Sequence, residues 1–361
     1  MLKRVYIDNF RCLVNFELQL GRQQLIMGLN GSGKSTLLDA LRAIKALVTG
    51  DVSPSDAFPS ESRTRWQDLG QQTVELEVDL GAAYLFRLET DVSGSPPMYG
   101  IKRELVLCDQ KPLFEFNEGE VTLFADSFDR TVSYPFDTSR SALATIQRRP
   151  DNKKLMRFKE WIGNLYCLAL NPWNMSGLAE REEARPKPDM SNFASWYRFM
   201  AQEHADSAFR LTEQLRKIIP DLESLDLPSA GANTRTLRFG FGGPGAEKFS
   251  VGFDELSEGQ RVLVCLYALL HFVVGPQACV FLDEPENFIA LNEIQPWLLE
   301  LQDRLEDGGQ VLLVSHHPEL INYLAPELGL VFERTGAGPA RVRNYQSEST
   351  LSPAEQTARG W

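Results

Sequence analysis

The chain has 361 residues, 43% hydrophobic and 24% charged, which is typical of a globular protein. Its formal net charge is −12, so the surface as a whole repels nucleic-acid phosphates, and contact with nucleic acid requires a local basic patch. The five cysteines lack the paired spacing of metal sites, which favours reduced core thiols in a cytoplasmic protein. The start lacks the apolar region of a signal peptide, and the longest apolar run, Val262 to Val274, is too short to span a membrane.

The first half of the chain predicts strands around one long helix. Alternating segments predict strands at 3–10, 13–20 and 23–27, and apolar residues at helical spacing predict a helix over 35–48. A loop or short helix is expected over 50–70. From Thr73 onward, further alternating segments separated by turn residues predict an antiparallel sheet.

The second half predicts helices followed by alternating helices and strands. The region 139–219 is mostly helical, with a strand at 164–170. The remaining expected elements are strands at 234–242 and 248–253, a helix at 258–274, a strand at 278–283, a helix at 293–305 and a strand at 310–315. The chain is therefore expected to be α/β.

A phosphate-binding loop is the clearest motif. Residues 28–36 read GLNGSGKST and match GxxxxGK[ST] between a predicted strand and a predicted helix. The glycines let backbone N–H groups surround phosphate oxygens, and the helix points its positive N-terminal end at the same anion. We expect Lys34 to bind the β/γ phosphates and Ser35 to bind Mg²⁺. The candidate nucleotide ligands are Asn30, Gly31, Ser32, Gly33, Lys34, Ser35 and Thr36.

Two carboxylates end the apolar strand in ACVFLDEPEN. A buried strand that ends in paired carboxylates suits a nucleotide site, although alone it is equally typical of a strand end in a turn. Downstream of a phosphate loop, we expect Asp283 to hold Mg²⁺ through water. Glu284 is the candidate general base for the attacking water.

Two further motifs flank this strand. In LSEGQ, Ser257 is expected to cap a helix whose free N–H groups around Gly259 attract an anion, and Gln260 completes the candidate ligands. A plain capped helix is the alternative. In LVSHHPEL, we expect His316 to contact a γ-phosphate or the attacking water. His317 competes for that role, and either histidine could simply lie on the surface.

In this order, the four motifs resemble those of an ABC-type ATPase. The start YIDNFRCLVNFEL, together with DEPEN in place of the transporters' DEPT, resembles the RecF/SMC-like group of AAA ATPases, which act in DNA repair and phage defence. Lys34 lies 222 residues before Leu256, a much longer separation than in a transporter ATPase. The resemblance covers residues 1–50 and 250–334 well.

The resemblance implies a fold, a partner and additional site residues. The expected domains are an ATPase core (1–50 and 231–345), an antiparallel β subdomain (70–138), a helical lobe (139–230) and a polar C-terminal tail (346–361). Two such heads form a homodimer around two ATPs, with Ser257 and Gly259 reaching the ATP of the other copy. Arg11, beside Asn9, is expected near the nucleotide. Gln147 is the candidate glutamine for Mg²⁺ and water, with Gln71 and Gln72 as alternatives.

An ATPase head of this kind opens and closes with nucleotide, and a partner molecule is expected to respond to that movement. No nuclease domain follows His316 in the roughly 45 residues that remain, so a separate effector protein is expected. Double-stranded DNA is the other candidate, through seven cations in the stretch 140–159 that include only one acidic residue, Asp151: Arg140, Arg148, Arg149, Lys153, Lys154, Arg157 and Lys159. A solvated helix face is the alternative explanation of this stretch. An ATP-gated scaffold with little turnover and a transporter subunit are the competing functions.

Overall fold

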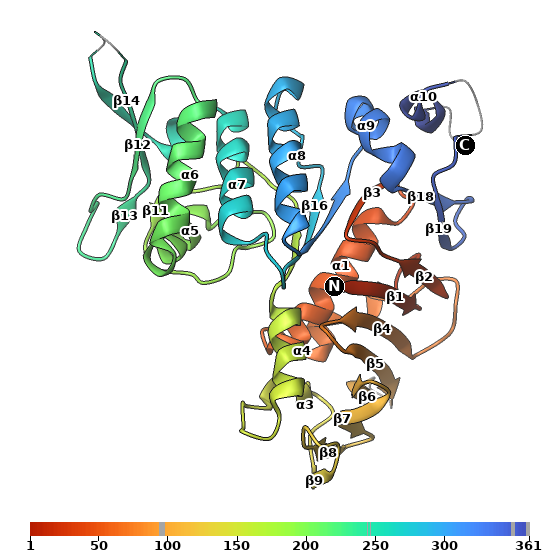
Figure 1. Ribbon diagram of the computed structural model, residues 1–361. Helices are drawn as coiled ribbons and strands as arrows, with labels where there is room; N and C mark the ends of the chain where they lie inside the picture. Colours follow the sequence, from red (N-terminus) through yellow and green to blue (C-terminus); the bar gives the residue numbers. More distant parts are fainter. Residues whose placement is uncertain (94–97, 244, 246, 348–350, 359–361) are drawn as a thin grey trace. The chain divides into compact units, whose positions relative to one another are not determined.

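The protein is described here by a computed structural model (Figure 1). Its chain divides into two compact units. The described residues are 1–93, 98–243, 245, 247–347 and 351–358. Unit 1 comprises Met1–Cys167, Gln277–Cys279 and Leu320–Trp361, and unit 2 comprises Leu168–Pro276 and Val280–Glu319. These units are compact groupings that do not follow the expected domain boundaries, which stay a prediction.

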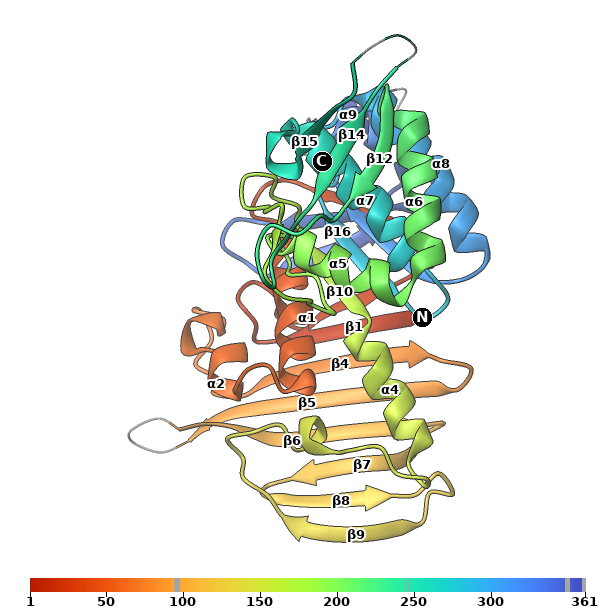
Figure 2. The same ribbon diagram turned by 90° about the vertical axis from the view of Figure 1, so that its left-hand side faces the viewer.

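Unit 1 contains an eight-stranded antiparallel sheet in the order β2-β1-β4-β5-β6-β7-β8-β9 (Figures 1 and 2). In β4, apolar residues at every second position are buried against the core, which is the period of a strand with one solvated face. The antiparallel sheet predicted from Thr73 onward is confirmed, and the first two predicted strands join it. The strands are β1 (Leu2–Asp8), β2 (Phe16–Gln19), β4 (Gln72–Asp79), β5 (Ala83–Ser93), β6 (Met98–Cys108), β7 (Lys111–Asn117), β8 (Glu120–Phe124) and β9 (Arg130–Pro135).

Helices cover one face of this sheet. In α4 (Lys153–Gly163), the Phe158 ring stacks on Tyr84 and Phe86 of β5, with ring centroids 6.2 and 5.6 Å apart. The same helix packs against α1 (Lys34–Thr49). Short helices fill the connections: α2 (Pro54–Ala57), a 3-10 turn (Ser60–Ser62) and α3 (Ala142–Thr145).

A second group of strands in unit 1 supports the phosphate loop. The strand β3 (Gln23–Gly28) pairs in parallel with β18 (Gly329–Arg334), which is antiparallel to β19 (Ala340–Asn344). Between 346 and 361, where a polar tail was expected, the chain forms α10 (Pro353–Ala358). The Tyr345 hydroxyl donates to Gln356 Oε1 at 3.2 Å, which anchors this helix.

Unit 2 is built around one buried helix, α7 (Glu258–Phe272), in which every residue from Val262 to Leu270 is buried. It packs between α6 (Ala205–Ile218) and α8 (Leu291–Glu306), and α5 (Phe193–Glu203) contacts both α6 and α7. The strands β16 (Cys279–Asp283) and β17 (Gln310–Val314) are neighbours. The other strands of unit 2 are β11 (Leu178–Ala179), β12 (Leu222–Asp226), β13 (Arg235–Thr236), β14 (Arg238–Phe241) and β15 (Phe249–Gly252). Most residues of β10 (Leu165–Leu168) and of α9 (Pro318–Leu328) belong to unit 1.

Two expectations from composition can be compared with this fold. All five cysteines are buried free thiols, which agrees with the prediction of reduced core residues. The apolar run that begins at Val262 lies within α7, and no helix in the described part of the chain has the length and apolar character of a membrane span.

A buried carboxyl on β6 anchors α3. The Ser141 hydroxyl donates to Glu104 Oε1 at 2.6 Å, and the Leu143 N–H donates to Glu104 Oε2 at 3.2 Å. Burial raises the pKa of Glu104 from 4.5 to about 7, and these hydrogen bonds oppose the shift only in part. The folded chain therefore holds a proton between these pH values that the unfolded chain releases.

Glu104 is expected to make stability depend on pH. Its contribution is complete below pH 4.5 and is lost as the pH rises through about 7. The neutral variant Glu104→Gln should therefore gain free energy of unfolding relative to the wild type between pH 5 and pH 8, by roughly 3 kcal/mol. Urea unfolding of both proteins at both pH values measures this gain, and an equal difference at the two values would contradict the assignment.

Candidate functional site

The phosphate loop follows β3 and is closed over its own lysine. The Lys34 Nζ donates to the carbonyl oxygens of Gly28, at 2.7 Å, and Leu29, at 3.1 Å. Gly28 is required because a Cβ there would lie 2.3 Å from the Phe332 oxygen of the adjacent strand. Gly33 caps α1 with a φ of 110°, a conformation that favours glycine. Backbone constraints thus place the ammonium group inside the loop.

The start of α1 fits an anion. Its N-terminus has no side-chain cap, and its first turn carries no acidic residue. The Ser32 hydroxyl is buried and, among the described atoms, has no hydrogen-bond partner. Because helix N-termini and unpaired buried donors both favour negative charge, this loop suits the phosphates of a nucleotide.

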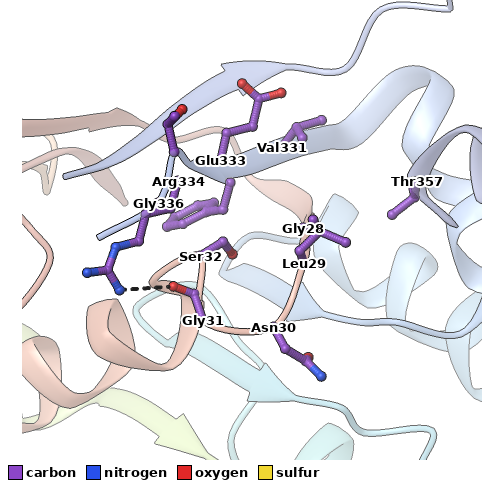
Figure 3. Close-up of a pocket in the computed structure, with 12 residues that line it drawn as sticks. Gly28, Leu29, Asn30, Gly31, Ser32, Val331, Glu333, Arg334, Gly336 and Thr357 are labelled. Atoms are coloured by element: carbon purple, nitrogen blue, oxygen red, sulfur yellow. Dashed lines mark hydrogen bonds between the residues drawn. The ribbon is translucent and has the colours of Figure 1, made fainter. Parts of the chain in front are cut away.

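A pocket of about 420 Å³ adjoins the loop (Figure 3). Residues Gly28 to Ser32 line one side, and the end of β18 with the turn that follows it lines the other. The guanidinium of Arg334 donates to the Gly31 oxygen at 3.4 Å and lies 5.6 Å from the ring centre of Trp66. A pocket of this size, with planar groups beside it, is suited to a small planar ligand such as a base. No motif in the sequence marks Arg334 or Trp66 as site residues.

The turn that follows β1 packs against the phosphate loop. The Cys12 Sγ lies 3.7 Å from Thr36 Oγ1, and Arg11 pairs with Asp39 of α1 at 2.5 Å. Arg11 has a φ of 50°, in the sparsely populated left-handed region. The structure therefore brings Arg11 to the helix that carries the phosphate loop.

Asn9, two residues before Arg11 in the motif, makes structural hydrogen bonds. It is completely buried, donates to the backbone oxygens of Leu69 and Gln71, and accepts from the Thr64 N–H. Its own backbone oxygen accepts from Gln72 Nε2 at 2.9 Å. These bonds hold the segment around residues 64–72 beside the first strand.

The three candidate glutamines have different surroundings. Gln72 is buried, and its amide bonds Asn9 and Ser62, so it is engaged within the fold. Gln71 accepts from Lys102 at 3.5 Å. Gln147 is exposed in the loop between α3 and α4, where its backbone oxygen accepts from Asn152. The role of Gln147 at Mg²⁺ therefore stays a prediction.

In unit 2, the carboxylate of Glu284 is held in a fixed orientation. Glu284 directly follows Asp283, the last residue of β16, and has a φ of 48°. Its N–H donates to the Val314 oxygen at 2.8 Å, and Asn287 Nδ2 donates to its Oε2 at 2.7 Å. A left-handed non-glycine residue costs roughly 1 kcal/mol or more and often occurs at a functional site. Asn287 was missed because its sequence context looks like an ordinary turn.

The structure distinguishes the two histidines. The His316 Nε2 lies 3.6 Å from Glu284 Oε1. The His317 Nδ1 instead accepts from the Glu319 N–H at 3.3 Å, within its own loop. His316, therefore, is the histidine that the fold places beside the candidate base.

The start of α7 has the predicted cap. The Ser257 hydroxyl accepts from the Gln260 N–H at 3.2 Å, and Gln260 Oε1 accepts from the Ser257 N–H at 3.1 Å. This reciprocal capping box engages the Gln260 side chain, a contact that the sequence analysis did not foresee. A Cβ at Gly259 would lie 2.6 Å from the Phe288 oxygen. The beginning of α7 therefore touches the loop that follows Glu284.

Four of the seven cations of the basic stretch have partners within the fold, two of them carboxylates. Arg148 pairs with Glu160, and Arg149 pairs with Asp151. The ammonium groups of two lysines donate to backbone oxygens, Lys154 to Asp126 and Lys159 to Ala144 and Ile146. The other three cations are exposed: Arg140, Lys153 and Arg157. The stretch therefore offers less charge to DNA than its composition implies.

Comparison with known proteins agrees with the motif analysis. The family model described as "AAA domain, putative AbiEii toxin, Type IV TA system" matches residues 25–322. An OLD nuclease of Thermus scotoductus is 51% identical over 55 residues, which are 15% of this chain and only 10% of that protein.

Two solved structures extend over nearly the whole chain. An SMC head bound to the C-winged helix domain of ScpA has a TM-score of 0.56 at 11% identity, covering 98% of this chain and 99% of that one. An SMC head domain from Thermotoga maritima has a TM-score of 0.47 at 14% identity, covering 96% and 99%. The former likeness confirms the predicted fold, an α/β head similar to that of an SMC protein.

Gly259 is expected to be required for the packing of α7 against the Glu284 loop. Gly259→Ala should lower the free energy of unfolding by about 1–3 kcal/mol because its Cβ meets a backbone oxygen. Gly275→Ala is the matched control, since nothing lies within 4 Å of a Cβ there. Urea unfolding compares the two variants, and equal stabilities would contradict the close approach.

Proposed function

The chain belongs to the AAA domain family whose model matches residues 25–322. On this premise we propose that it binds ATP with Mg²⁺ and hydrolyses it to ADP and phosphate. The observation that carries the proposal is the fixed Glu284 carboxylate, bonded by Asn287 at 2.7 Å and faced by His316 at 3.6 Å. A chain that only bound nucleotide would have no need to orient a base at the end of a strand.

The residues have distinct proposed roles. The phosphate loop binds the ATP phosphates, and Lys34 exchanges its bonds to the Gly28 and Leu29 oxygens for bonds to phosphate oxygens. Ser35 and Asp283 would hold Mg²⁺, which neutralises phosphate charge when it is bound. Glu284 accepts the proton of the attacking water, and His316 steadies the water or the γ-phosphate.

The nucleoside has a proposed place beside the loop. The pocket lined by Gly28 to Ser32 is large enough for part of a small ligand, and Arg334, whose guanidinium contacts the Trp66 ring, supplies a planar surface in its lining. Arg11, which the fold brings to α1, is the other proposed contact near the nucleotide.

The catalytic cycle is proposed to involve two copies of the chain. In the ABC-type arrangement, Ser257 and Gly259 of one copy contact ATP on the other. The capped N-terminus of α7 supports this role because its backbone N–H groups attract phosphate. ATP binding then closes a homodimer and hydrolysis reopens it.

The output is proposed to pass to a separate effector protein, in DNA repair or in defence against phages and mobile elements. The solved SMC head with its bound ScpA domain is one example of this fold that carries a protein partner. The local similarity to an OLD nuclease supports a nucleic-acid process. Contact with double-stranded DNA would depend mainly on Arg140, Lys153 and Arg157, which are exposed and lie outside the two ion pairs of the basic stretch.

Lys34→Ala is expected to abolish ATP binding because no other ammonium group takes its position in the loop. Lys45→Ala, a change of the same kind farther along α1, should leave ATP affinity unchanged. Isothermal titration with ATP and Mg²⁺ measures both. Wild-type affinity in Lys34→Ala would overturn the assignment of the phosphate loop.

Glu284→Gln is expected to bind ATP normally and to hydrolyse it roughly 100-fold or more slowly, because the amide cannot accept the proton. Phosphate release under single-turnover conditions measures the step directly. Glu293→Gln, on α8, is the control. If Glu284→Gln releases phosphate at the wild-type rate, Glu284 is not the base. If the wild type itself releases almost none, the competing function as an ATP-gated scaffold is favoured.

A further inference from the structure

A buried carboxyl and a buried hydroxyl join the loop of Glu284 to the loop of His316. Glu286 is 6% exposed and Ser315 is completely buried. The Ser315 hydroxyl donates to Glu286 Oε1 and accepts from the His317 N–H at 3.0 Å. One hydroxyl thereby connects the loop after β16 with the backbone that carries His316.

The contact between His316 and Glu284 does not fix their positions by itself. At 3.6 Å it is longer than an ordinary hydrogen bond. Their relative placement therefore depends on the two loops, and the bond from the Glu284 N–H to the Val314 oxygen joins these loops only at the ends of the strands. The bond between Glu286 and Ser315 joins the two loops a second time, two residues after Glu284 and one residue before His316.

Packing alone does not explain a carboxyl at this place. Burial raises the pKa of Glu286, and its Oε2 is buried without a hydrogen-bond partner among the described residues. An apolar side chain of similar volume would avoid this desolvation cost. The one hydrogen bond that this carboxyl accepts from another side chain, among the described residues, is the bond from Ser315 to Oε1.

We propose that Glu286 is a positioning residue, whose hydrogen bond from Ser315 sets His316 relative to Glu284 for hydrolysis. The proposal rests on the proposed ATPase activity. Glu286 touches neither nucleotide nor water in this role and acts only through the loop that Ser315 anchors. A displacement of about 1 Å in such a site can lower the rate by as much as 100-fold.

The test compares Glu286→Ala, Glu286→Gln, Ser315→Ala and the double alanine variant, with Glu319→Gln as a control on an exposed carboxylate in the first turn of α9. Glu286→Ala should lower kcat roughly 10- to 100-fold while the Kd for ATP stays unchanged, because Lys34 is untouched. Glu286→Gln should restore most of kcat, since its Oε1 accepts the same bond. The double variant should be no slower than the slower single variant, because both changes remove one interaction.

Three outcomes would overturn the proposal. Losses that add in the double variant would show that the two residues act separately. A Gln variant as slow as the Ala variant would show that the carboxylate itself is needed. A parallel loss of ATP affinity would show a general structural effect. If Glu286→Ala fails to fold, Glu286→Gln and Ser315→Ala still test the proposal: the first should keep most of kcat and the second should lose it.

An independent readout separates this proposal from the ATPase assignment. The NMR signals of the His316 imidazole should shift in Glu286→Ala and return in Glu286→Gln, even if the wild type hydrolyses no ATP. An absence of hydrolysis in the wild type would overturn the proposed function alone. An unchanged His316 signal in Glu286→Ala would overturn the positioning role.

Discussion

The backbone of Glu284 is the constraint on which the candidate catalytic group depends. A non-glycine residue with a φ of 48° persists only when its surroundings hold it, and here the Glu284 N–H is bonded to the Val314 oxygen of the neighbouring strand. This turn points the carboxylate toward Asn287 and His316. The strand end, the base and its orienting residues therefore form one local arrangement within unit 2.

Two glycines, Gly28 and Gly259, each allow one backbone segment to lie close to another. At Gly28, the phosphate loop leaves β3 against the Phe332 oxygen, and at Gly259, the start of α7 lies against the Phe288 oxygen. Neither position has space for a Cβ. Gly28 lets the end of β3 lie against β18, and Gly259 lets the start of α7 lie against the loop after Glu284. The starts of α1 and α7 are the groups proposed to bind phosphate.

Prediction from the sequence succeeded where a pattern is local. The phosphate loop, the cap at Ser257 and the strand that ends at Asp283 each depend on a few adjacent residues, and the structure contains all three elements. The roles of these residues in catalysis stay proposals. The buried carboxyl of Glu104 was missed because its partner, Ser141, is distant in the sequence and no local pattern relates them.

The other differences between the sequence-based predictions and the structure also arise from tertiary contacts, which local sequence patterns do not show. A cluster of cations looks like a binding patch until Glu160, Asp151 and backbone oxygens are seen to engage four of its members. The polar tail contains a helix because Tyr345 and Gln356 meet. Trp66 and Arg334 are far apart in the sequence and meet only in the folded chain.

The central claim is that ATP is hydrolysed between two copies of the chain, and mixing two inactive variants tests it most directly. Lys34→Ala lacks a working phosphate loop, and Ser257→Arg lacks a working start of α7, so each alone should be inactive. In the mixed dimer, the intact phosphate loop of one copy meets the intact α7 of the other. Our account predicts that mixing restores ATP hydrolysis. A mixture no more active than its two components would contradict it.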